Sequence, residues 1–231
     1  MNRKIRFEDL GVSGYKKTWD YQETLMQRVI DQKLDKKTNP EKESDNYLLF
    51  VEHPHVYTLG KSGDEQNLLL NYIQLQAAHA EFFHTNRGGD ITYHGPGQIV
   101  GYPIFDLENF GIGLRRYIFL MEEAIIKAIA EYGLTGGRDE KATGVWLDAG
   151  TPSARKICAI GVKSSRFVTM HGLALNVNTD LSYFQHINPC GFTDRGVTSI
   201  EKELGAKQDF EAAKKVVLEK MIEVYEGNLS S

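Results

Sequence analysis

The sequence predicts one α+β domain covering residues 1–231. Stretches with helical spacing of apolar residues are interspersed with short apolar runs that suit strands. No internal repeat or low-complexity linker divides the chain. A chain of this length buries roughly 70–75% of the surface of its unfolded form, so it can hold a core without a metal or a disulfide.

The first half of the chain predicts two helices and two strands. Residues 18–30 place Tyr21, Leu25 and Val29 on one helical stripe. Residues 36–46 are polar and contain Pro40, which is typical of a surface loop. A buried strand, a second helix and a strand ending near Pro103 are expected at residues 47–51, 67–80 and 98–105.

The second half begins with the most regular helical stripe of the chain, at residues 114–132, and Gly133 follows it as a stop signal. Three strands, or a strand and a hairpin, are expected at residues 143–147, 155–163 and 166–178. An amphipathic helix is expected at residues 209–227.

Composition narrows the class of protein. Hydrophobic residues make up 41% of the chain and charged residues 25%, which is ordinary for a soluble globular protein. No apolar run approaches the ~20 residues of a membrane helix, and the first residues lack the apolar segment of a secretory signal. We therefore expect a cytoplasmic protein. The net charge of −4 argues against general nucleic-acid binding. The two cysteines, Cys158 and Cys190, are expected to be free thiols.

Strand alternation in the 155–163 segment sets Lys156 on one face with Cys158, Ile160 and Val162. An ammonium on such an apolar face is partly desolvated, and its pKa falls. A strand-end lysine that reaches solvent explains the same spacing, and spacing alone favours that simpler interpretation.

Small residues form a second pattern. Ala159 and Gly161 share the opposite face of this strand. Alternation in the next strand sets Gly172 and Ala174 on one face, and His171, Leu173, Leu175 and Val177 on the other. Together these small residues would leave a slot for a thin aliphatic chain, or they would let a helix pack closely.

The thiol of Cys190 lies between Pro189 and Gly191, a pair typical of a tight turn. A turn can expose a thiol, and the thiolate is its reactive form. Most free cysteines are buried fillers, so Cys190 alone is a weak candidate nucleophile. Its rival Cys158 lies in the middle of an apolar strand, where a thiol is normally inert.

Polar groups that could assist a nucleophile precede the 98–105 strand. The Arg87–Gly88–Gly89 loop can cradle an anion or a carbonyl with its backbone N–H groups, although such loops are individually unspecific. His94 and His171 are candidate acid–base or oxyanion groups. The spacing of cysteines and histidines matches no zinc motif, so no metal site is expected.

Several blocks of sequence, in order, resemble the lipoyl(octanoyl) transferase family. The most specific is RGGDITYHGPGQ, which starts at Arg87. The others are EHPHVYTLG, TGVWL, RKICAIGVK, HGLALNVNTDL and INPCG, which start at Glu52, Thr143, Arg155, His171 and Ile187.

The resemblance implies a mixed β-sheet flanked by helices, similar to the catalytic domains of biotin and lipoate protein ligases. It also implies transfer of an octanoyl group, without a cofactor or metal, from octanoyl-acyl carrier protein to a lysine of a lipoyl domain. The acceptors would be lipoyl domains of 2-oxo acid dehydrogenase complexes and the glycine cleavage H protein, with no nucleic acid or membrane as partner.

Site residues follow from the same resemblance. Cys190 would carry the acyl thioester and Lys156 would tune that cysteine, which reverses the preference for a merely solvated lysine. Substrate contacts would come from Arg87, Gly88, Gly89, Asp90, Ile91, Thr92, Tyr93, His94, Ala159, Ile160, Gly161, Gly172, Leu173 and Ala174.

Three alternatives stay open at this point. A lipoate or biotin protein ligase shares the fold but activates a free acid with ATP and needs no covalent cysteine. A binding module could keep the fold without catalysis. A cysteine hydrolase would use the same nucleophile with a histidine and release free acid, although His186 is merely close to Cys190 in sequence.

Overall fold

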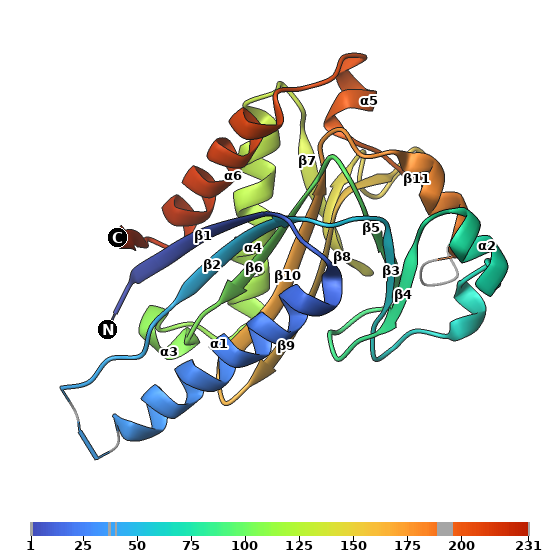
Figure 1. Ribbon diagram of the computed structural model, residues 1–231. Coiled ribbons are helices and arrows are strands. Elements are labelled where there is room, and N and C mark those ends of the chain that lie inside the picture. The colour runs from blue at the N-terminus through green and yellow to red at the C-terminus, as the bar shows by residue number, and fades with distance from the viewer. Residues whose placement is uncertain (1, 37, 40, 189–195, 231) are drawn as a thin grey trace.

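A computed structural model describes residues 2–36, 38–39, 41–188 and 196–230 (Figure 1). Across this part of the chain, nine strands form one mixed sheet in the order β12-β1-β2-β6-β10-β9-β8-β7, and β11 pairs with β9. In chain order these strands are β1 (Lys4–Val12), β2 (Tyr47–Glu52), β6 (Gln98–Ile104), β7 (Gly136–Asp139), β8 (Ala142–Leu147), β9 (Arg155–Ser165), β10 (Val168–Asn176), β11 (Gly196–Val197) and β12 (Asn228–Ser230).

A smaller sheet of three strands lies beside the large one, in the order β4-β3-β5 (Figure 1). Its strands are β3 (Val56–Leu59), β4 (Glu81–His84) and β5 (Ile91–His94). The helices of the described residues are α1 (Tyr15–Asp35), α2 (Tyr72–Ala77), α3 (Leu107–Phe110), α4 (Leu114–Ala130), α5 (Ile200–Leu204) and α6 (Phe210–Val224), with short 3₁₀ turns η1 (Glu65–Asn67) and η2 (Leu181–His186).

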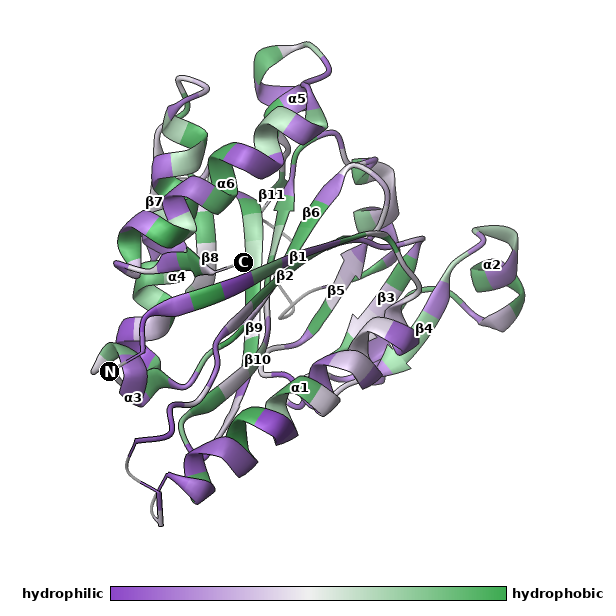
Figure 2. Cartoon of the chain, turned by 60° about the vertical axis from the view of Figure 1, so that its left-hand side comes forward, coloured by the Kyte–Doolittle hydropathy of each residue, from purple (hydrophilic) through white to green (hydrophobic). Residues whose placement is uncertain are grey.

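Helices cover both faces of the large sheet: α1 lies on one face, and α4 and α6 lie on the other (Figures 1 and 2). The side chains of β2 show how one strand serves both layers. Leu48 and Phe50 belong to the apolar cluster packed under α4 and α6. Tyr47 and Leu49 belong to the cluster under α1. A strand buried on both faces reads as a continuous apolar run, which is what the sequence shows here.

Most predicted elements are present with shifted ends. The helices at 18–30, 114–132 and 209–227 correspond to α1, α4 and α6, and the strands at 47–51, 98–105, 143–147, 155–163 and 166–178 correspond to β2, β6, β8, β9 and β10. The last of these begins later than predicted because Arg166 and Phe167 adopt positive φ angles of 52° and 64° in a turn.

The predicted helix at residues 67–80 is wrong over half of its length, because only Tyr72–Ala77 is α-helical. Leu68 forms a bridge with Ile187, and the N–H of Leu69 donates to the carbonyl of His186 over 2.9 Å. These extended contacts use the backbone groups that a helix needs. The helix starts only at Tyr72, after the N-cap residue Asn71, which forms a capping box with Gln74.

No helix within the described ranges is both long enough and apolar enough to cross a membrane.

Candidate functional site

A cavity of about 1110 Å³ lies against strands β5, β6, β9 and β10, next to the 87–90 loop and η2. Lys156 lines it. All predicted substrate-contact residues except Tyr93 line it as well. They are Arg87, Gly88, Gly89, Asp90, Ile91, Thr92, His94, Ala159, Ile160, Gly161, Gly172, Leu173 and Ala174. The sequence blocks, far apart along the chain, therefore converge on one space.

Tyr93 points away from this cavity. Its side chain is fully buried and belongs to a cluster with Tyr57 and Ile187. Its ring stacks on Tyr183 with a centroid separation of 4.9 Å, and its hydroxyl lies 2.7 Å from Nδ1 of His55. Tyr93 therefore anchors β5 to η2.

Small residues pair across the sheet at the cavity wall. Ala159 lies opposite Ala174, and Gly161 lies opposite Gly172. The glycines use their space for backbone contacts, since a Cβ on Gly161 would lie 2.9 Å from the Gly88 carbonyl oxygen, and one on Gly172 would lie 2.1 Å from that of Gly101. The sequence left two interpretations of these small residues, a slot for an aliphatic chain or close packing of a helix. At the two glycines close packing is found, but the partners are neighbouring backbone segments and not a helix. Both glycines nevertheless line the cavity, as the two alanines do.

The 87–89 loop is fixed to the sheets by Arg87, which is only 7% exposed. One guanidinium nitrogen, Nη2, donates to the Thr58 carbonyl over 2.6 Å, and Nη1 donates to the Gly88 carbonyl over 3.0 Å. The N–H of Gly88 donates to the Val162 carbonyl of β9 over 2.9 Å. Arg87 thus holds the loop against the cavity wall.

The face assigned to Lys156 needs correction. The pairing of β8 with β9 contains a bulge: Trp146 lies opposite Lys156, and its neighbour Val145 lies opposite Cys158, which leaves Ile157 as the extra residue. Ile157 and Cys158 both enter the cluster under α4. Lys156 therefore faces the cavity together with Ala159 and does not share a face with Cys158.

Among the described residues, the Thr143 carbonyl and the Trp146 ring contact the Lys156 ammonium at the cavity wall. Nζ donates to the carbonyl of Thr143 over 3.2 Å, and it lies 4.7 Å from the centroid of the Trp146 ring. Both partners come from the TGVWL block, to which sequence reasoning had assigned no role. Pairing the expected strands at 143–147 and 155–163 with each other would have indicated these partners of Lys156.

The thiol of Cys158 is fully buried, and burial raises its pKa to about 12. It is protonated at neutral pH and closed to substrate, as expected for an inert strand cysteine.

Cys190 lies outside the described residues. The described residues on either side of its segment, Asn188 and Gly196, both line the cavity. Val197 then pairs with Lys156, and the N–H of Thr198 donates to the Lys156 carbonyl over 2.9 Å.

The two candidate acid–base histidines are buried. Burial is the main reason that the pKa of each falls to about 3, so both rings are neutral at pH 7. Nδ1 of His94 donates to Oε1 of Gln98 over 2.9 Å, while Nε2 of His171 donates to Oδ1 of Asn86 over 2.7 Å. A base of this pKa is a poor acceptor of a thiol proton.

His171 also lies on the opposite face from the one predicted. Its ring neighbours Trp19 and Tyr102 on the α1 side, whereas Leu173 and Leu175 pack under α4. A positive φ of 58° at His171 breaks the simple alternation of β10.

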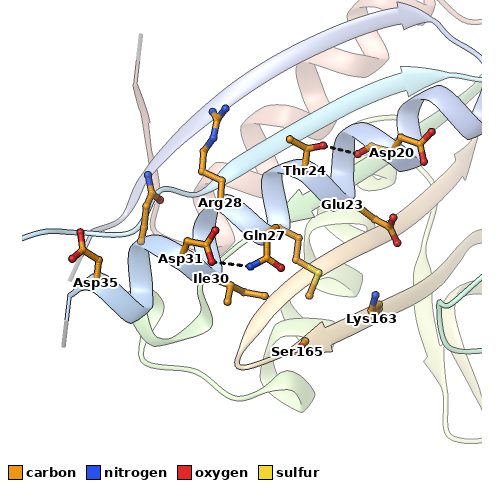
Figure 3. Close-up of a pocket in the computed structure, with 12 residues that line it drawn as sticks. Asp20, Glu23, Thr24, Gln27, Arg28, Ile30, Asp31, Asp35, Lys163 and Ser165 are labelled. Atoms are coloured by element: carbon orange, nitrogen blue, oxygen red, sulfur yellow. Dashed lines mark hydrogen bonds between the residues drawn. The ribbon is translucent and has the colours of Figure 1, made fainter. Parts of the chain in front are cut away.

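A second, shallower hollow runs along α1, and Figure 3 shows its lining. Four carboxylates border it together with Lys163 and Ser165 of β9, namely Asp20, Glu23, Asp31 and Asp35. None of the predicted site residues lies there. Across the described ranges, no group of three or more histidine, cysteine or acidic side chains is arranged to hold a metal ion.

Comparisons with known proteins agree on one family. The family model of the lipoyl protein ligase A/B catalytic domain matches residues 14–222. The octanoyltransferase of Flavobacterium johnsoniae is 57% identical over 231 residues, which cover 99% of this chain and 100% of that protein. The octanoyltransferase of Cytophaga hutchinsonii is 51% identical over 234 residues, which cover 100% of this chain and 96% of the relative.

Solved structures confirm the expected fold. A bi-partite lipoate protein ligase from Thermoplasma acidophilum matches with a TM-score of 0.68 at 12% identity, covering 100% of this chain and 88% of that one. A biotin protein ligase from Aquifex aeolicus matches with a TM-score of 0.50 at 13% identity, covering 98% of this chain and 70% of the other.

Proposed function

Because the chain belongs to the lipoyl protein ligase A/B catalytic domain family and, within it, to the octanoyltransferases, we propose that it moves an octanoyl group from octanoyl-acyl carrier protein, through a thioester on Cys190, to a lysine of a lipoyl domain. The acceptors are the lipoyl domains of 2-oxo acid dehydrogenase complexes and the glycine cleavage H protein.

One observation carries this proposal. Lys156 presents its ammonium to a cavity whose wall also contains the residues that bracket the Cys190 segment, Asn188 and Gly196. The alanine pair and the apolar side chains of Ile160 and Leu173 line the same space. An aliphatic acyl chain gains roughly 0.8 kcal/mol for each CH₂ group that it buries on such a surface.

The first step is a thioester exchange. Lys156 first releases its ammonium proton to solvent. The Cys190 thiol then gives its proton to the resulting neutral amine, and the thiolate attacks the acyl carbonyl of the carrier-bound thioester. The bond to the carrier thiol breaks, and that thiolate takes the proton back from Lys156. A free thiol with a pKa of about 8.5 is only a few per cent thiolate at neutral pH, so a positioned base speeds this step.

The second step forms an amide. The acceptor lysine has an ordinary pKa of about 10.4, so it must lose a proton before it attacks the Cys190 thioester. Lys156, neutral after the first step, accepts that proton. The amine then attacks the acyl carbon, the bond from that carbon to the Cys190 sulfur breaks, and the leaving thiolate takes the second proton that the nitrogen loses as the amide forms. The donor thioester is already activated, so this reaction consumes no nucleotide, and the carrier departs before the acceptor binds.

An assay of two donors tests the proposal against the ligase alternative. The protein is mixed with an unmodified lipoyl domain and given either octanoyl-acyl carrier protein without ATP, or octanoate with ATP and Mg²⁺. We expect octanoylation of the lipoyl lysine in the first mixture alone. Octanoylation that requires octanoate and ATP would identify a ligase instead, and release of free octanoate in the first mixture would identify a hydrolase.

A further inference from the structure

A buried carboxylate stands behind the peptide group that binds Lys156. Glu122 of α4 is only 8% exposed, and its Oε1 accepts the N–H of Gly144 over 3.0 Å. The carbonyl on the other side of the same peptide bond belongs to Thr143, and it accepts the Lys156 ammonium over 3.2 Å. A carboxylate, one peptide group and an ammonium therefore form a continuous hydrogen-bonded chain.

The backbone conformation at Gly144 permits this series of hydrogen bonds. Its φ of 128° is one that side-chain-bearing residues rarely adopt, and a Cβ here would lie 2.5 Å from the Cys158 carbonyl oxygen. Gly144 lies opposite Ala159, two residues beyond the bulge at Ile157 in β9. Gly144 thus allows the peptide to turn its N–H toward α4 and its carbonyl toward Lys156.

Arg138 of β7 holds the carboxylate in place. Its Nε donates to Oε2 of Glu122 over 3.1 Å, and its Nη2 donates to Oε2 of Glu123 over 2.6 Å and to the Phe119 carbonyl over 3.1 Å. Glu122 therefore uses one oxygen for Arg138 and the other for the peptide. The neighbouring Glu123 shares the arginine, but among the hydrogen bonds of the described residues it makes none to Gly144, so it is a matched control.

Hydrogen bonds in series polarise one another. A negative charge on the N–H side of the peptide makes the Thr143 carbonyl a stronger acceptor for a cation. We propose that Glu122 is a positioning residue that sets the place and the basicity of the Lys156 amine through the 143–144 peptide. This inference rests on the proposed role of Lys156 in octanoyl transfer, and it adds a residue that does not touch substrate.

Other charged or titratable groups lie in the same region. Arg138 and Glu123 lie behind Glu122, the Cys158 thiol lies within the electrostatic reach of both Lys156 and Glu122, and Lys141 and Lys202 line the same cavity. The test must therefore compare variants that differ in one carboxylate only.

The experiment measures Lys156 directly, without relying on turnover. The folded protein is labelled with a trace of an amine-acylating reagent over a pH series, and mass spectrometry gives the extent of labelling at Lys156. This is done for the wild type, E122Q and E123Q. In E122Q, loss of the negative charge destabilises the ammonium, so we expect the labelling midpoint to move to lower pH. In E123Q the midpoint should stay at the wild-type value.

Activity gives the second readout. E122Q should transfer octanoyl groups about tenfold more slowly, with the drop in kcat and little change in KM, because a charge-assisted contact is replaced by a neutral one. The acidic limb of its pH–rate profile should shift in the same direction as the labelling midpoint. E122D keeps the charge at a shorter reach, so it should show a smaller shift, and it serves as the second variant where E122Q does not fold.

An unchanged labelling midpoint in folded E122Q, or an equal shift in E123Q, would overturn this role for Glu122. An absence of octanoyl transfer by the wild type would instead defeat the proposed function, and the labelling comparison would still decide whether Glu122 controls the lysine.

Discussion

The ammonium of Lys156 lies over the indole ring of Trp146, 4.7 Å from its centroid, and the two residues are paired across β8 and β9. A cation over an aromatic face gains about 0.5–2 kcal/mol. Together with the Thr143 carbonyl, the ring keeps the amine at the cavity wall. The proposed chemistry requires a base at this point.

Replacing Lys156 by methionine removes the amine and keeps an aliphatic stem over Trp146. Octanoyl transfer should fall at least about 100-fold, since a positioned acid–base group typically contributes 10²–10⁴-fold. The fold should be retained, because Lys156 lies at a cavity wall. Initial rates and urea unfolding of the same preparation check both points. A K156M variant with wild-type rates would remove Lys156 from the mechanism.

Replacing Gly144 by alanine should destabilise the protein by roughly 1–3 kcal/mol, the usual cost of one residue held in a sparsely populated backbone conformation. Its φ of 128° is unfavourable for alanine, and the new Cβ would meet the Cys158 carbonyl oxygen at 2.5 Å. Gly150→Ala is the control for strain without a clash, because Gly150 has a φ of 78° and open space where its Cβ would be. Equal losses in the two variants, measured by urea unfolding, would mean that the contact with Cys158 contributes nothing.

Cys158 should resist alkylation in the folded protein. Its thiol is fully buried and its pKa is raised to about 12, so almost no thiolate exists at pH 8. Iodoacetamide labelling followed by peptide mass spectrometry should modify Cys158 only after denaturation. C158A should keep octanoyl transfer near the wild-type rate. Rapid alkylation of native Cys158, or loss of activity in C158A without unfolding, would make it the competing nucleophile.

Acid should destabilise the fold through buried histidines. Burial lowers the pKa of His53 to about 4 and those of His94 and His171 to about 3. The folded state thus prefers neutral rings, whereas the unfolded chain takes up protons near pH 6.5. The stability that these histidines contribute is complete above pH 6.5 and is lost as pH falls toward 3.

Each such histidine makes the unfolding free energy fall by about 1.4 kcal/mol per pH unit within that window. Urea unfolding between pH 7 and 4 measures this slope. H94Q should reduce the slope, because it removes one of the three rings whose pKa burial lowers. If H94Q unfolds with the wild-type slope, His94 titrates in the folded protein near its ordinary pKa.

Periodicity predicted the layers well because most elements bury a regular stripe. The apolar stripe of α4 correctly predicted a helix, and the continuous apolar run of β2 correctly predicted a buried strand. The prediction failed at residues 67–80, where extended contacts of Leu68 and Leu69 with η2 and the residue that follows it override local helix propensity. A contact between segments so far apart in the chain leaves no local pattern.

Site prediction depended on two kinds of information. Among the described residues that the sequence blocks named, all but Tyr93 converge on one cavity. Simple alternation put Lys156 and His171 on the wrong faces, because a bulge shifts the first and a positive φ displaces the second. Neither irregularity has a signature in the order of apolar residues. The contact of Glu122 could not be predicted for a related reason, because only the packing of α4 against β8 brings this residue to the 143–144 peptide.

The most direct test of the account is the intact mass of the protein after mixing with octanoyl-acyl carrier protein, without ATP and without an acceptor. The account predicts a gain of one octanoyl group in the wild type and in C158S, and no gain in C190S. A gain that persists in C190S and disappears in C158S would contradict it.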